Sequence, residues 1–131
     1  MKPAPSGLTY TFGKIKYVVP AGWHRLPYRC PAVAPGALLM PMSARTRCPE
    51  DTATDEHILV QSRPMSRRFP PGRHVDLVGG FQAGVQVEPE RFAHVLYVVL
   101  MAGDAQTEIL IDVRAVHRDV ATTFLSDVSP A

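Results

Sequence analysis

Apolar and polar residues alternate near the start of the chain, in the two-residue period of a half-buried β-strand. Residues 8–12 carry apolar side chains at every second position, and residues 15–19 repeat this pattern one residue out of phase. The phase shift falls at Gly13-Lys14 and predicts a bulge or a tight turn. A Pro-Ala-Gly segment at residues 20–22 then ends the strand region, and a lone Trp at this place usually closes one end of a core.

The C-terminal third shows the clearest pattern. Residues 95–101 form a continuous β-prone apolar run, which is typical of a central strand covered on both faces. A short loop separates this run from residues 107–115, so we expect the two strands to pair as an antiparallel hairpin. Alternation in the second strand predicts three apolar side chains inward (Ile109, Ile111, Val113) and three charged ones mostly outward (Glu108, Asp112, Arg114).

Proline and glycine interrupt the middle of the chain. Residues 37–40 and 57–61 predict short strands, the second of which is ended by Pro64. Several Pro and Gly residues are expected to keep residues 62–74 out of regular structure. Residues 75–78 predict either a strand or a helical turn, and the two glycines that follow weaken both alternatives.

The last element changes period. Its apolar positions form one stripe of a helix, made of Val120, Ala121, Phe124, Leu125 and Val128. Asp119 is a good N-cap for this helix, and Pro130 is expected to close it.

Together these patterns predict a single domain over residues 1–131, with residues 1–7 as a flexible N-terminal tail. The expected fold class is α+β, mainly an antiparallel β-sheet with a short C-terminal helix packed on it. A chain of 131 residues with 46% apolar and 20% charged residues has the composition of a globular domain. A domain of that size needs neither metal nor disulfide to fold.

The charge and the apolar runs limit the partners. A net charge of +2 is too small to indicate nucleic acid or an anionic lipid surface. No segment reaches the ~18–20 continuous apolar residues of a transmembrane helix. The first residues lack the apolar region of a signal peptide. We therefore expect a cytoplasmic protein, or a periplasmic one from which a signal peptide was removed.

The two cysteines, Cys30 and Cys48, lie in Pro-rich irregular sequence. In a cytoplasm they would stay reduced, whereas in an oxidising compartment a bridge between them would stabilise the fold by about 3 kcal/mol in the chain-entropy model. Together with His57 and His74 they match none of the paired ligand spacings of zinc sites. We expect no metal and no cofactor.

Residues 10–23 form a strand that leads into a Pro-x-Gly-Trp corner. This opening resembles the PsbP-like group, whose members also end with a long β-hairpin and a short helix carrying a Phe, as Phe124 is placed here. The resemblance implies an antiparallel sheet with helices packed on it. Bacterial members of the group include lipoproteins and chaperones for secreted toxins of the type VI system. Residues 62–90 depart from the group, because they hold too many Pro and Gly residues for its long helix.

No catalytic motif stands out beside the well-patterned core. His117-Arg118-Asp119 matches the kinase catalytic tripeptide, but the chain is far too short for that fold and lacks its glycine-rich loop. This contrast favours a non-enzymatic protein-binding module, and we expect a bacterial immunity protein or chaperone whose protein partner is a secreted toxin or effector.

The predicted contact surface is the loop from Arg63 to Arg73, which we call the Arg-rich loop, because Arg and aromatic residues are enriched at binding hot spots. Its expected partner-binding residues are Arg63, Arg67, Arg68, Phe69 and Arg73.

Two alternatives stay open. The first is a small enzyme with an unrecognised pocket that uses His24, His74 or His94 as its base. The second is an extracytoplasmic structural or lipid-handling domain with a Cys30–Cys48 bridge.

Overall fold

Antiparallel β-strands make up most of the structure, a computed structural model that describes residues 7–26, 36–42, 56–64, 74–88, 91, 93–101 and 107–131. Its elements, in chain order, are β1 (Thr9–Phe12), β2 (Ile15–Val18), β3 (Trp23–Arg25), β4 (Gly36–Pro41), β5 (His57–Pro64), β6 (His74–Val78), β7 (Phe81–Glu88), β8 (His94–Leu100), β9 (Thr107–Ala115), α1 (Arg118–Ser126) and β10 (Ser129–Pro130).

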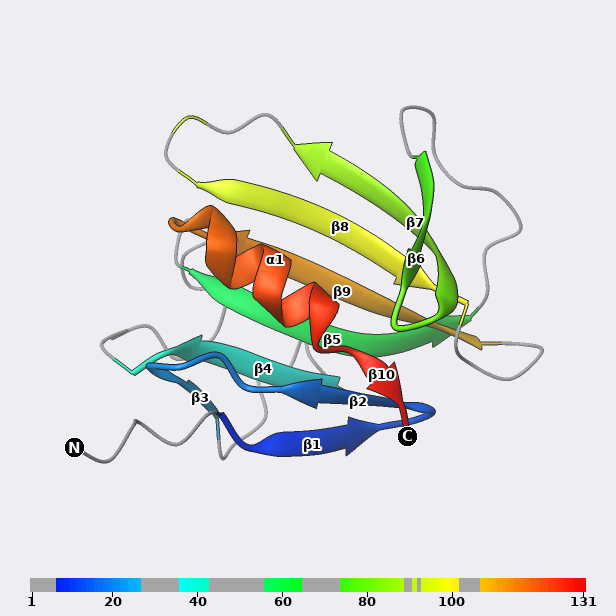
Figure 1. Ribbon diagram of the computed structural model, residues 1–131, viewed down its shortest axis with the longest axis horizontal. Helices are drawn as coiled ribbons and strands as arrows, with labels where there is room; N and C mark the ends of the chain where they lie inside the picture. The colour runs from blue at the N-terminus through cyan, green and yellow to red at the C-terminus, as the bar shows by residue number, and fades with distance from the viewer. Residues whose placement is uncertain are drawn as a thin grey trace.

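Seven strands form one large sheet in the order β3-β4-β5-β9-β8-β7-β6, with antiparallel neighbours throughout. Figure 1 shows that this sheet is strongly twisted. Val98 of β8 lies opposite Ile111 of β9, which in turn lies opposite Val60 of β5, so a row of fully buried side chains crosses its middle. The predicted antiparallel pairing of residues 95–101 with residues 107–113 in the sheet interior is confirmed.

One face of the large sheet is covered by α1 and by a small sheet with strand order β1-β2-β10. Figure 1 shows the helix lying across the middle strands, with the small sheet beside it. Phe124 and Ala121 of the helix and Ile15 and Tyr17 of β2 join the large sheet in one hydrophobic core. A mainly antiparallel sheet with a short C-terminal helix packed on it is therefore confirmed.

Glycines make two of the hairpin turns. Gly13 has a φ of 59° between β1 and β2, so the phase shift in the sequence is a tight turn and not a bulge. Gly79 and Gly80, with φ of 61° and 83°, join β6 to β7. Two successive positive φ angles are typical of a two-residue hairpin turn that matches the twist of its strands. Here the glycine pair makes the hairpin instead of weakening it.

The middle of the chain holds more strand than the sequence analysis predicts. The expectation of irregular structure over residues 62–74 is wrong at both ends, because β5 continues through Pro64 and β6 begins at His74. Residues 75–78 are a strand, and not a helical turn. Residues 81–88 form a further eight-residue strand, β7, which the sequence analysis does not identify.

The C-terminal helix has different ends from those predicted. Its N-cap is His117, which makes no side-chain capping hydrogen bond, while Asp119 lies in the first turn. A carboxylate there still interacts favourably with the positive end of the helix dipole. The helix ends at Ser126, and Pro130 lies in β10 instead of closing it. Val128 belongs to the predicted stripe and is buried, although it follows the helix.

The opposite face of the large sheet also buries side chains. Val95 and Val99 of β8 are 5% and 1% exposed, and Leu38 and Met40 of β4 form a second small apolar cluster. Glu108, expected to point mostly outward, is only 1% exposed. Alternation does place Glu108 on the opposite face of the sheet from Ile109, but that face is shielded from solvent at this position as well.

Candidate functional site

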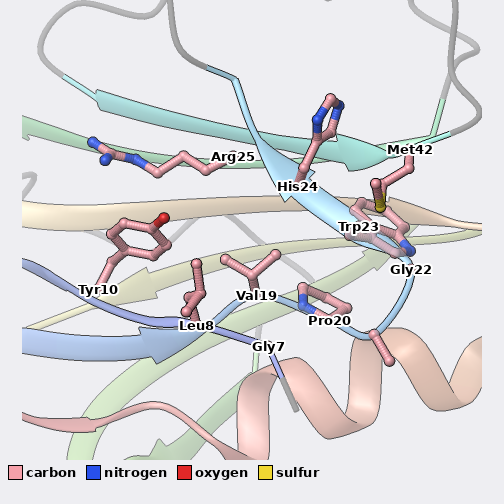
Figure 2. A pocket seen from close by; sticks show the side chains of 11 residues that line it. Gly7, Leu8, Tyr10, Val19, Pro20, Gly22, Trp23, His24, Arg25 and Met42 are labelled. Atoms are coloured by element: carbon pink, nitrogen blue, oxygen red, sulfur yellow. The ribbon is translucent and has the colours of Figure 1, made fainter. Parts of the chain in front are cut away.

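A pocket of about 410 Å³ lies between the two sheets. One wall comes from β1, at the edge of the small sheet, and the other from β3, at the edge of the large sheet. Its main side chains, shown in Figure 2, are Leu8, Tyr10, Val19, Trp23, Arg25 and Met42. The volume falls within the range of about 300–1,000 Å³ that is usual for ligand pockets. We call it the edge pocket.

Strand periodicity explains how the sequence builds these walls. Leu8 and Tyr10 are two positions apart on one side of the pocket, as Trp23 and Arg25 are on the other, so each pair projects from a single face of the chain. Gly22, with a φ of 80°, lies in the turn before β3. In this turn the backbone N–H of Trp23 donates to the Pro20 carbonyl at 3.0 Å. This hydrogen bond fixes where the indole enters the pocket.

Aromatic rings connect the edge pocket to the core. Tyr10 stacks on Tyr17 with ring centres 6.0 Å apart, and Tyr17 meets Phe124 of α1 at 6.0 Å. The Arg25 guanidinium lies 4.9 Å from the centre of the Tyr10 ring, a distance at which a cation is attracted to the ring face. This contact holds the positive charge at the pocket wall.

Tyr17 is 1% exposed beneath the edge pocket. Burial raises the pKa of its phenol above the ordinary value, while the positive charge of Arg25 acts in the opposite direction. The phenol therefore stays neutral at physiological pH, and its ring supports Tyr10, which lines the pocket.

The rim of the edge pocket is apolar and open to solvent. Leu8 is 66% exposed and Met42 is 68% exposed, and both line the pocket. Among the described residues that line it, none carries a carboxylate, and Arg25 brings the permanent charge. Apolar surface around a cavity whose lining includes one guanidinium is typical of a binding site for an apolar group next to a negative charge.

A second pocket, of about 250 Å³, lies on the opposite face of the large sheet over β5, β9 and β8. The strand register assembles its polar residues, because Arg114 lies opposite His57 and Asp112 lies opposite Tyr97. An imidazole, a guanidinium, a carboxylate and a phenol therefore share one lining. Such a set can bind a polar small molecule and can exchange protons with it. We call this the polar pocket.

Most of the predicted partner-binding residues lie outside the part of the chain that the structure describes. Arg63 lies in β5 opposite Glu108, whereas Arg67, Arg68, Phe69 and Arg73 lie outside the described residues. The Arg-rich loop therefore stays a prediction. The same holds for the Cys30–Cys48 bridge, whose two residues also lie outside the described part of the chain, and for the flexible tail, of which only Gly7 is described.

The three histidines proposed as an enzymatic base do not come together. They lie on β3, β6 and β8, which are not neighbours in the sheet. His24 contributes to the edge pocket, but its ring projects to the other side of β3 in Figure 2. His94 is exposed at the start of β8. His57, which the sequence analysis considers only as a metal ligand, is the histidine that lines the polar pocket.

Neither a metal centre nor a membrane-spanning helix is found in the described residues. No three His, Cys, Asp or Glu residues among them are close enough to hold a metal ion. No helix in the ranges described is long and apolar enough to cross a bilayer.

Comparison with known proteins provides a fold and no activity. A crystal structure from Bacteroides thetaiotaomicron VPI-5482 is similar to this chain, with a TM-score of 0.58 and 6% sequence identity. The match covers 96% of this chain and 49% of that one, so this chain spans about half the length of the solved protein. No protein-family model and no curated protein matches the chain. The resemblance to the PsbP-like group stays a prediction.

Proposed function

We propose that this chain is a non-enzymatic protein-binding domain that takes an apolar side chain of its partner into the edge pocket. The observation that carries the proposal is the combination of an open apolar cavity with two exposed apolar side chains on its rim, Leu8 and Met42. Apolar surface that stays in water without a covering group is a feature of protein-interaction sites.

The chemistry of the walls supports a polypeptide with an apolar anchor next to an acidic residue. Burying one Leu or Phe side chain in the pocket would contribute about 1.5–3 kcal/mol. Arg25 at the wall would attract a negative charge on the partner, which favours orientation and rate of association more than affinity. That the partner is a secreted toxin or effector, with this chain as its immunity protein or chaperone, stays a prediction from the sequence.

The experiment uses the chain's one tryptophan as an internal reporter, because Trp23 lines the edge pocket. Decapeptides selected from a random displayed library on the wild-type protein would be synthesised and titrated against it. Filling of the pocket is expected to shift the Trp23 emission to shorter wavelength. Leu8→Glu, which places a charge on the rim, is expected to weaken binding roughly tenfold or more.

Val87→Glu is the matched control, because Val87 is also an exposed apolar side chain, 59% accessible, but lies on β7 away from the pocket. It should bind the peptides as the wild type does. If the selected peptides bind Leu8→Glu unchanged and lose affinity for Arg67→Glu with Arg68→Glu, the Arg-rich loop is the binding surface and the edge pocket is not.

A second candidate function rests on the polar pocket. Its imidazole, carboxylate, phenol and guanidinium would suit a polar small molecule, in keeping with the enzymatic alternative. Screening a library of small metabolites by thermal shift, against wild type and His57→Ala, tests it. A ligand that stabilises the wild type and not His57→Ala would favour this function over protein binding.

A further inference from the structure

Strand β3 ends the large sheet and has a neighbour, β4, on one side only among the described strands. The hydrogen bonds to β4 fall on alternate residues. The Met42 N–H donates to the Gly22 carbonyl at 2.9 Å, and the Leu26 N–H donates to the Leu38 carbonyl at 3.0 Å. In an antiparallel ladder the residues between such bonds direct their N–H and C=O groups away from the partner strand. In β3 these outward residues are Trp23 and Arg25.

Three of the four outward groups have no hydrogen-bond partner within the part of the chain that the structure describes. The Trp23 N–H is already used, because it donates to Pro20. The Trp23 carbonyl, the Arg25 N–H and the Arg25 carbonyl form no hydrogen bond with any described residue. Backbone groups in this arrangement are a template for strand addition.

Trp23 and Arg25 also project their side chains to the same side of β3, into the lining of the edge pocket (Figure 2). A strand added along β3 would thus place alternate side chains over that pocket. In antiparallel pairing, the residue opposite Trp23 comes two positions after the residue opposite Arg25. The side chain opposite Trp23 meets apolar walls, and the one opposite Arg25 meets a guanidinium.

Resting on the proposed function, we propose that β3 is extended by an antiparallel segment of an acidic partner polypeptide that carries the order acidic–x–apolar. The acidic side chain pairs with Arg25, and the apolar side chain enters the edge pocket beside Trp23. The backbone of the residue opposite Arg25 exchanges two hydrogen bonds with it. The occupant is a polypeptide because a lipid or a small apolar molecule would leave the outward backbone groups of β3 without partners. It is acidic because the described lining holds a cation and no carboxylate.

The first experiment compares three synthetic peptides by Trp23 fluorescence on the full chain. The reference is an acetylated and amidated heptapeptide, Ser-Thr-Glu-Thr-Phe-Thr-Ser. The second peptide exchanges its Glu and Phe, which reverses the order while keeping the composition. The third keeps every side chain but carries an N-methyl group on the Glu amide. We expect both changed peptides to bind roughly tenfold more weakly, because one loses the side-chain register and the other loses a backbone donor.

The second experiment separates the backbone of Arg25 from its side chain. Arg25→Ala removes the guanidinium and keeps the N–H, whereas Arg25→Pro removes both. The Arg25 N–H points away from β4, so proline there leaves the β3–β4 ladder intact. We expect Arg25→Pro to bind the reference peptide roughly tenfold more weakly than Arg25→Ala does. The peptide series tests the same pairing without altering the protein, so it decides the matter should Arg25→Pro fail to fold.

The two proposals fail in different ways. If the three peptides bind equally well, and Leu8→Glu weakens all of them, the edge pocket is a binding site but strand addition is wrong. If no peptide binds and no decapeptide is selected, the proposed function itself fails. Dimerisation of the wild type that Arg25→Pro abolishes would overturn the partner assignment, as would a tenfold gain in affinity on deleting residues 1–6. In either case the occupant would be this chain.

Discussion

The edge pocket and the polar pocket lie on opposite faces of the same sheet, and they offer a ligand different chemical groups. The edge pocket lies beside β3, where outward backbone groups accompany a set of mostly apolar side chains. The polar pocket lies over β5, β9 and β8, three neighbouring interior strands. Their backbone groups are used in ladders on both sides, so only side chains face a ligand there.

Because of this difference, the edge pocket suits recognition of a polypeptide, whereas the polar pocket suits recognition of a small molecule. An extended polypeptide carries a regular series of donors and acceptors, and a strand edge can match that series. A small molecule needs a few converging polar groups, which an interior surface supplies with greater rigidity. The comparison predicts that substitutions in the interior act mainly on stability, whereas substitutions at the edge act mainly on binding.

The largest expected effect is in the interior. Val99→Asp puts a charge at a position of β8 that is 1% exposed, and an unpaired buried charge destabilises by about 3–5 kcal/mol. Val87→Asp makes the same change on β7, where the side chain is 59% exposed, and should lower stability by less than about 1 kcal/mol. Urea unfolding followed by circular dichroism measures both. Equal losses would contradict the distinction between interior and surface.

A smaller effect compares two adjacent residues of the edge strand. The alternation in β3 directs the His24 N–H toward Met40 and the Arg25 N–H away from β4. His24→Pro should therefore cost about 1–2 kcal/mol more than Arg25→Pro, because it alone breaks the ladder. Both variants share the restricted backbone angle of proline. Arg25→Pro also loses the contact with Tyr10, of about 0.5 kcal/mol, which narrows the difference without reversing it.

Thermal denaturation of the two proline variants, side by side, makes this comparison. A lower melting temperature for Arg25→Pro than for His24→Pro would show that the assigned ladder alternation is wrong. Strand addition at Arg25 would then lose its geometric basis.

The smallest effect concerns Tyr17 beneath the edge pocket. Burial holds its pKa above that of the unfolded chain, so the unfolded chain releases its phenolic proton first as the pH rises. The stability that the buried neutral phenol contributes is fully present below the unfolded pKa, and it is lost as the pH rises above about 10. Tyr17→Phe should have a shallower alkaline decline in stability than the wild type. Parallel declines in urea titrations from pH 9 to 11 would contradict the burial of this phenol.

The parts of the fold that the sequence predicts best are those fixed by local patterns. The apolar run of residues 95–101 indicates a central strand because its side chains are apolar on both faces. The two-residue period of residues 107–115 identifies the next strand. Glu108 shows where this reasoning stops, because alternation gives the face of a residue but not whether that face is covered.

Strand β7, in contrast, is an element whose pattern is present in the sequence but is not identified as a strand. Phe81, Ala83, Val85 and Val87 alternate with polar residues or glycine, so the signal is present in the sequence. Glycine is unfavourable in an isolated strand, which conceals the pattern. In the folded protein β7 is paired on both sides, by β6 and β8, and these ladders outweigh its weak local propensity.

Neither pocket could be found from one sequence. Tyr10 and Arg25 meet because β1 and β3 edge two different sheets, and His57 meets Arg114 because β5 pairs with β9. Both juxtapositions depend on which strands become neighbours, and residue periodicity does not specify that. Trp23 gave a local signal, since a lone Trp after a Pro-Ala-Gly turn indicates the end of a core.

The pairing of β10 with β2 bears on the order in which the molecule assembles. Ser129 lies opposite Lys16, and the Ala131 N–H donates to the Lys14 carbonyl at 2.9 Å. During synthesis, β1 and β2 emerge from the ribosome long before their third strand exists. Contacts between segments so far apart in the chain form slowly, because a large loop must close first. The small sheet is therefore among the last parts of the protein to be completed.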